Sequence, residues 1–160
     1  MSDGMVPDQK PGVCFVVGGW HLPLHFEVIK SKLEALGYLV VVPKPPTCSE
    51  NGNLSWKDDV AEIQREVAPY MDQGKEFIIV GHSYGGVPAC AATQGYTTIE
   101  RAESGKKGGF RSILFISAVI LPKAGMDILQ LLGGSYPPFL LGSEPYTKVC
   151  GRISSTKVPG

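Results

Sequence analysis

The fold is decided by residues 77–86, which read Phe77-Ile78-Ile79-Val80-Gly81-His82-Ser83-Tyr84-Gly85-Gly86. An unbroken run of large apolar residues, 77–80, is typical of a strand that is buried on both faces of a parallel sheet. The run leads directly into a glycine-rich turn, and small residues follow at 87–93. This composition suits a helix that packs closely on a sheet. The stretch therefore predicts a strand–turn–helix unit with Ser83 at the turn.

The alternation of apolar strands and amphipathic helices continues on both sides of this unit. Upstream, Val13 to Val17 and Tyr38 to Val42 are apolar runs typical of buried strands. Apolar residues at helical spacing predict one helix over 23–36 and a second that begins after Ser55. Downstream, Ser112 to Leu121 is a fourth apolar run. Because strands that alternate with helices form parallel sheets, we predict a doubly wound α/β domain with four parallel strands.

The composition excludes several classes of protein. A chain of 160 residues, 43% hydrophobic and 19% charged, has room for one sizeable core and is not typical of disorder. Its 15 basic and 15 acidic side chains cancel, so we expect no nucleic-acid partner. The longest strongly apolar stretch, Ile113 to Leu121, is too short to span a bilayer. The 4 cysteines are scattered and indicate neither a metal site nor a disulfide framework, and no cofactor is implied.

The chain is expected to divide into three parts. Residues 1–12 are polar, broken by proline and unlike a signal peptide, so we expect a flexible segment and a cytoplasmic location. Residues 13–132 make up the α/β domain, and residues 133–160 are a lid remnant or an irregular tail. Within the domain, residues 101–109 are expected to form a solvated loop that carries positive charge, including that of Arg101.

The Gly81-His82-Ser83-Tyr84-Gly85 motif has the spacing that presents a nucleophilic serine at a sharp strand-to-helix turn. Such a turn strains the serine backbone, and glycines two residues before and after it avoid collisions with the flanking elements. The free N–H groups of the following helix face any negative charge that develops at the serine. The alternative is a glycine-rich turn with an incidental serine. The predicted strand before the motif and helix after it favour a nucleophile.

These features resemble the α/β-hydrolase superfamily, in particular its small esterase-like and hydroxynitrile-lyase-like members. The resemblance extends over residues 13–132 and rests on the Gly81–Gly86 motif, the turn Val17-Gly18-Gly19-Trp20-His21 and the helix start at Ser55–Asp59. Members of the family read His-Gly at the first turn, and Val17 departs from that pattern.

The resemblance implies a partial α/β-hydrolase fold and a serine mechanism. Ser83 would be the nucleophile, and the backbone N–H groups of Gly19 and Tyr84 would form the oxyanion hole. The substrate would be a small ester or a related acyl compound. Trp20, His21 and His82 are further candidates for contacts with that substrate.

The histidine that the family uses as a base has no counterpart in this chain. The family's order is serine, then aspartate or glutamate, then histidine, whereas His21, His25 and His82 all precede or adjoin Ser83. A serine hydroxyl is a weak nucleophile until a base takes its proton. His21, one residue beyond the oxyanion turn, is the first substitute to consider. We therefore expect a chain truncated after the fourth strand, with weak or no hydrolase activity.

Two alternatives stay open beside a weak hydrolase: a non-catalytic binding or interaction protein on a hydrolase scaffold, and a truncated product of a longer enzyme. Asp127 is the only acidic residue between the fourth strand and Glu144, and without a histidine to orient it is expected at a solvated helix position. The outer edge of the fourth strand has no later strand to cover it, so self-association through this edge is expected.

Overall fold

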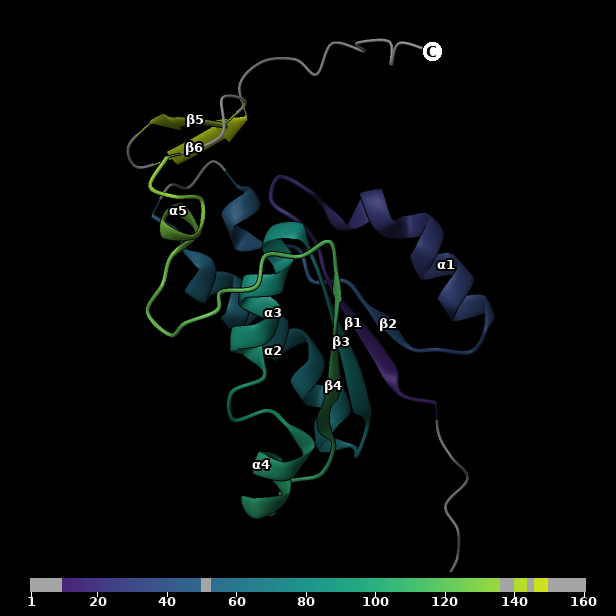
Figure 1. Ribbon diagram of the computed structural model, residues 1–160. Coiled ribbons are helices and arrows are strands. Elements are labelled where there is room, and N and C mark those ends of the chain that lie inside the picture. Colours follow the sequence, from purple (N-terminus) through teal and green to yellow (C-terminus); the bar gives the residue numbers. More distant parts are fainter. Residues whose placement is uncertain (1–9, 50–52, 136–139, 144–145, 150–160) are drawn as a thin grey trace, which may run out of the picture. The chain divides into compact units, whose positions relative to one another are not determined.

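The computed structural model describes residues 10–49, 53–135, 140–143 and 146–149, and Figure 1 shows its helices and strands. The strands are β1 (Gly12–Val16), β2 (Val40–Val41), β3 (Glu76–His82), β4 (Gly109–Ile116), β5 (Leu140–Ser143) and β6 (Tyr146–Val149). The α-helices are α1 (Glu27–Ala35), α2 (Trp56–Asp72), α3 (Gly86–Ala92), α4 (Thr98–Glu103) and α5 (Ile128–Leu131). Short 3₁₀ helices are η1 (Pro23–Phe26), η2 (Pro46–Cys48) and η3 (Ser83–Gly85).

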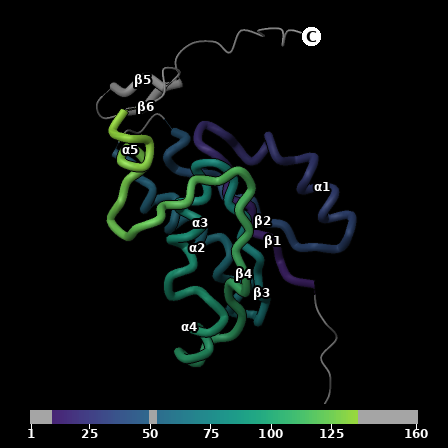
Figure 2. The backbone as a smooth tube through the Cα atoms, viewed as in Figure 1, coloured from purple at the N-terminus to yellow at the C-terminus, as the bar shows by residue number. Residues whose placement is uncertain are grey.

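The first four strands form one parallel sheet in the order β2-β1-β3-β4, which confirms the predicted fold class. The register pairs Val16 of β1 with Gly81 of β3, and His82 of β3 with Ile116 of β4. The carboxyl ends of three neighbouring strands, β1, β3 and β4, therefore lie side by side along one edge of the sheet, which runs across the strands. The tube in Figure 2 follows the chain through the crossovers between these strands. Ser83 follows β3 directly at this edge, where open α/β sheets bind their ligands.

Helices cover both faces of the sheet, with α1 on one face and α2 and α3 on the other (Figure 1). On the α2–α3 face the buried cluster contains Cys14, Val16, Val41, Ile63, Val67, Met71, Phe77, Ile79, Ala89, Ala92 and Phe110. On the α1 face it contains Val13, Phe15, Val17, Val40 and Val80, with Phe26 and Leu33 packed against it. Alternate residues of β1 thus face opposite clusters, as expected of a strand that is buried on both faces.

Helix α2 begins at a capping box that fixes the direction of its first turn. The Ser55 hydroxyl accepts a hydrogen bond from the backbone N–H of Lys57 (3.3 Å), and the Asp58 carboxylate accepts one from the backbone N–H of Ser55 (2.7 Å). The next side chain, Asp59, is only 2% exposed. The cap therefore places a carboxylate in the interior at the start of α2.

The segment that was expected to be a solvated loop, residues 101–109, is only partly a loop. Residues 101–103 complete helix α4, and Arg101 is 3% exposed. Its guanidinium donates hydrogen bonds to the Lys107 carbonyl and, at 2.7 Å, to the Asp72 carboxylate. The expectation of a solvated Arg101 is wrong because the fold brings it two acceptors, one of them from α2.

Strand β4 lies at one edge of the sheet and is shorter than predicted at its carboxyl end. It ends at Ile116, and the next residue, Ser117, has a φ of +43° that no strand can continue. The large apolar side chains of Leu114, Ile116 and Ile120 are 52%, 39% and 52% exposed. Apolar surface is therefore exposed along this strand and just beyond it, in line with the expectation that no later strand covers its outer edge.

The chain divides into two compact units, Met1–Ile120 and Leu121–Gly160. In the second unit β5 and β6 form an antiparallel pair with Leu140 opposite Val149, which the sequence did not indicate. The expected N-terminal segment lies outside the described residues over 1–9, as does the expected tail over 136–139, 144–145 and 150–160. The domain limits taken from the sequence remain a prediction.

Within the described ranges, no helix has the length and apolar character that crossing a bilayer requires.

Candidate active site

Ser83 lies in a strained backbone conformation at the junction of β3 and η3. Its φ is +52°, in the left-handed region that residues with a Cβ rarely adopt. Such a conformation costs ~1–3 kcal/mol and persists only where the surrounding structure holds it in place. The side chain is half-buried at the edge where β1, β3 and β4 end. This is the position that the sequence predicts for Ser83.

Close packing explains the glycines on either side of Ser83. A methyl group on Gly81 would lie 2.8 Å from the Cα of Gly86, and one on Gly85 would overlap the carbonyl oxygens of Val16 and Val17. The turn that carries Ser83 therefore rests directly on the end of β1. Any side chain at Gly85 would push these two backbones apart.

The turn after β1 lies against the turn after β3. A methyl group on Gly18 would lie 3.0 Å from Ser83 Cβ, and one on Gly19 would lie 3.6 Å from Tyr84 Cβ. The fold thus brings together Ser83, Gly19 and Tyr84, which the sequence singled out as nucleophile and backbone donors. Two turns fixed by separate strands can hold such donors without rearrangement during a reaction.

A third strand end also supports this site, and the sequence gave no signal for it. The backbone N–H of Val119, in the loop after β4, donates a hydrogen bond to the Ser83 carbonyl (2.8 Å). Trp20, Ser83 and Ser117 have φ angles of +59°, +52° and +43°, and each lies just after β1, β3 or β4. Strained residues concentrate at functional sites, and here they gather at one edge of the sheet.

All three histidines of the chain lie at this same edge. The ring of His21 is 5.7 Å from that of His82 and 5.6 Å from that of His25, between centroids. His21 Nδ1 is 2.9 Å from the Gly19 carbonyl oxygen. Because a carbonyl can only accept, Nδ1 carries the hydrogen in this contact and Nε2 of a neutral His21 is left as an acceptor.

His82 has a different environment from its neighbours. Its Nδ1 is buried and has no hydrogen-bond partner among the described residues. Burial lowers the pKa of His82 below its ordinary value of 6.5, and the charge of His21 lowers it further. His82 therefore resists protonation in the folded chain.

The Tyr84 side chain reaches a buried carboxylate that sequence reasoning did not assign to the site. Its hydroxyl donates a hydrogen bond to Asp59 Oδ2 (2.8 Å), and Thr47 donates two more to the same carboxylate. Burial raises the pKa of Tyr84 strongly, and the charge of Asp59 adds to the shift. The sequence did contain a signal for the burial of Asp59. This residue lies on the same helical face as Trp56 and Ile63, and apolar residues at helical spacing mark that face as buried.

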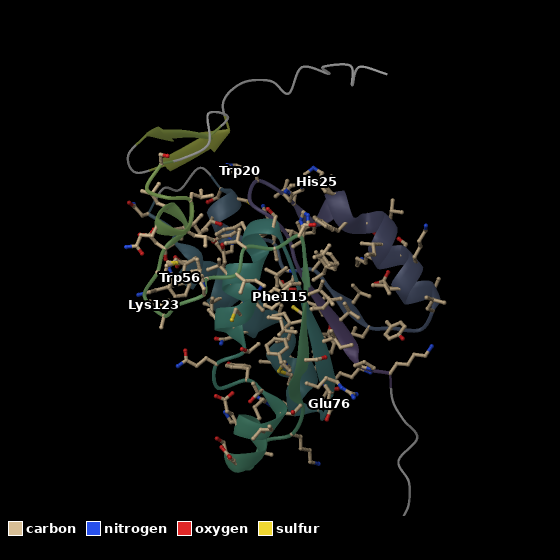
Figure 3. The ribbon with its side chains drawn as sticks, in the orientation of Figure 1. Trp20, His25, Trp56, Glu76, Phe115 and Lys123 are labelled. Atoms are coloured by element: carbon tan, nitrogen blue, oxygen red, sulfur yellow. The ribbon has the colours of Figure 1, made fainter. Side chains whose placement is uncertain are left out.

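Two further candidates, Trp20 and Asp127, are exposed. Trp20 is 53% exposed, and Figure 3 places it with His25 at the opposite end of the sheet from Glu76, the first residue of β3. Asp127 caps α5, where its carboxylate accepts a hydrogen bond from the backbone N–H of Gln130 (2.7 Å). This capping role matches the helix position that was expected for Asp127.

A doubly wound parallel sheet with a left-handed serine at a strand–helix turn defines an α/β protein with the backbone geometry of a nucleophile elbow. A sequence model described as the alpha/beta hydrolase family matches residues 15–152. The chain therefore belongs to the alpha/beta hydrolase family.

Two curated proteins that are similar to this chain are also named as hydrolases. The chain is 28% identical over 114 residues to an alpha/beta hydrolase of Aspergillus novofumigatus (71% of this chain, 45% of the relative). It is 30% identical over 128 residues to a probable hydrolase of Phoma sp. (78% of this chain, 49% of the relative). It therefore spans about half the length of these curated relatives. Its fold is similar to that of an extracellular alpha/beta-hydrolase from a Paenibacillus species, with a TM-score of 0.55 and 19% identity over 70% of this chain and 42% of the other.

Replacing Gly85 by alanine should destabilise the domain by about 3 kcal/mol or prevent folding, because the methyl group meets two backbone carbonyls. Gly19→Ala is the matched control, since its methyl group would find ordinary contact distances. It should change the free energy of unfolding by less than about 1 kcal/mol. Denaturant unfolding of the three proteins measures the difference. Equal stability losses would show that the turn after β3 is not packed as described.

Acidification should destabilise the folded chain through His82. The unfolded chain takes up this proton near pH 6.5, whereas the folded chain takes it up only at lower pH. The folded state thus binds fewer protons, so the free energy of unfolding falls as the pH drops below that value. His82→Gln should lose part of this dependence between about pH 7.5 and about pH 5.5, whereas His25→Gln should retain it. Urea titrations at several pH values would test this, and an unchanged slope in His82→Gln would contradict it.

Proposed function

We propose that the chain carries the reactive centre of a serine hydrolase that acts on small esters or related acyl compounds. The observation that carries the proposal is the strained Ser83 (φ +52°), which lies between β3 and the following helix and against the Gly18–Gly19 turn. Ser83 Oγ would attack the ester carbonyl, and the N–H groups of Gly19 and Tyr84 would stabilise the resulting oxyanion. The proton that Ser83 loses would pass to the departing alcohol, and attack by water on the acyl–Ser83 bond would then release the acid and restore Ser83.

The mechanism also requires a base. Ser83 must lose its proton as it attacks, and none of the three histidines follows it in these 160 residues. His21 is the first candidate, because Nε2 of its neutral ring is left as an acceptor when Nδ1 binds the Gly19 carbonyl. We therefore propose a slow enzyme for a protein of these residues.

The description of the Paenibacillus hydrolase suggests a class of ligand to test. The Paenibacillus hydrolase is described as sharing structural and functional homology with tobacco salicylic acid binding protein 2. A small aromatic acid or its ester is accordingly one class of ligand to test. The proposed location is the cytoplasm, since no disulfide joins Cys14, Cys48 and Cys90 to one another in the described part of the chain, which suits a reducing compartment.

A non-catalytic binding protein on the same scaffold is the second candidate. The observation that favours it is again the position of the histidines, none of which follows Ser83 in these 160 residues. A truncated product of a longer enzyme would share that property. The two functional candidates differ in whether Ser83 reacts.

The test is Ser83→Ala, compared with the parent chain for hydrolysis of an activated small ester and for labelling by a fluorophosphonate. Loss of the base from a serine triad costs several orders of magnitude, so we expect turnover of the parent near background. Slow labelling of the parent and none of Ser83→Ala would support a reactive serine. Fast turnover that Ser83→Ala abolishes would show that another group activates the serine, and His21→Ala would then test whether that group is His21. No labelling of either protein would favour the binding scaffold.

We further propose that the chain associates with itself through β4, whose Leu114 is 52% exposed on an outer strand. Leu114→Lys should reduce association at high protein concentration, because it places a charge on that strand. Val28→Lys is the control, since Val28 on α1 is 71% exposed and receives the same charge. Light scattering measures the association. A parent chain that stays monomeric at every concentration would refute the proposal.

A further inference from the structure

Asp59 is a buried carboxylate to which the proposed mechanism gives no role. It is 2% exposed and accepts three hydrogen bonds. The backbone N–H of Thr47 donates to Oδ1 (3.0 Å), the Thr47 hydroxyl to Oδ2 (2.8 Å) and the Tyr84 hydroxyl to Oδ2 (2.8 Å). The carboxylate therefore joins η2 and the turn after β3 to the first turn of α2.

The surroundings of Asp59 offer its charge little other support. The ion pairs found among the described residues do not include it. The space beside Asp59 and Tyr84 measures about 10 Å³, room for no more than a single water. It is lined by Val16, Val17, Pro43, Pro45, Ile63 and Pro88. In such a dry setting each hydrogen bond to a carboxylate is strong and directional, so the tyrosine is held firmly.

Tyr84 is also the residue whose backbone N–H is proposed to bind the oxyanion. Its hydroxyl is fixed to α2, while the carbonyl of the preceding residue, Ser83, accepts a hydrogen bond from Val119 after β4. The peptide that joins Ser83 to Tyr84, directly after the strained φ of Ser83, is therefore held at both ends. A strained conformation needs such restraints to persist.

We propose that Asp59 is a positioning residue, which acts through the Tyr84 side chain to hold the Tyr84 N–H in line with Ser83. This inference rests on the proposed function, because it gives the Tyr84 N–H a part in the reaction. The competing view is that Asp59 only attaches η2 to α2 through Thr47. The two views differ in which of the two hydroxyl donors matters for Ser83.

The chain offers a matched pair of variants for this test. Tyr84→Phe and Thr47→Val each remove one hydroxyl donor to the same atom, Asp59 Oδ2, and leave the backbone N–H groups in place. Asp59 itself is left intact, because its removal would also free η2. The free energy of unfolding of both variants is measured first, to show that they lose similar stability. Two readouts follow: the rate of fluorophosphonate labelling at Ser83, and the ¹⁵N order parameter of the residue 84 amide.

The positioning role predicts a difference between the two variants. Tyr84→Phe should slow labelling about tenfold, less than complete loss of an oxyanion donor would. It should also lower the order parameter of the residue 84 amide from the rigid value of about 0.85. Thr47→Val should leave both unchanged. Equal effects of the two variants, or no effect of Tyr84→Phe, would overturn the inference.

The order parameter separates this inference from the proposed function. If a fluorophosphonate does not label the parent chain, the proposed function fails. A lower order parameter in Tyr84→Phe alone would still support the positioning of Tyr84 by Asp59, and equal values in the two variants would overturn it.

Discussion

The left-handed backbone of Ser83 is the constraint on which the arrangement of the site depends. A residue with a Cβ adopts a φ of +52° only where its neighbours hold it there. Here β3 leads directly into the turn, the glycines at 81 and 85 let the backbone approach β1 and α3, and Val119 binds the Ser83 carbonyl. These contacts bring the turn after β1 against Ser83 and Tyr84. The order of the strands in the sheet thus determines the geometry of the site.

Much of the fold could be predicted because its determinants are local in sequence. Apolar runs and glycine turns mark β1 and β3, and their bounds differ from the prediction by only a few residues. The end of β4 could not be predicted, because the apolar run continues past Ile116 and only the backbone of Ser117 breaks it. Burial of Arg101 escaped prediction because one of its acceptors, Asp72, lies in α2, far away in the sequence.

The candidate site, like the fold, has a part that local sequence predicts and a part that depends on tertiary packing. Ser83, Gly19 and Tyr84 follow from a short motif and from a resemblance to a family to which the chain belongs. The contact of Asp59 with Tyr84 depends on how α2 packs on the sheet, and only the position of a carboxylate on an apolar helix face hinted at it. The approach of His21 to His82 likewise depends on the pairing of β1 with β3, which no local pattern reveals. Local patterns therefore identify the reactive turn, while tertiary packing supplies the residues that support it.

A crystal structure of the chain after fluorophosphonate modification tests most directly whether the strained turn forms a reactive centre. The predicted result is a phosphonyl group on Ser83, with φ of this residue still positive. One phosphonyl oxygen should lie about 2.7–3.1 Å from the backbone nitrogens of both Gly19 and Tyr84. A phosphonyl oxygen that contacts neither nitrogen, or a Ser83 backbone with negative φ, would contradict the link between strain and reactivity.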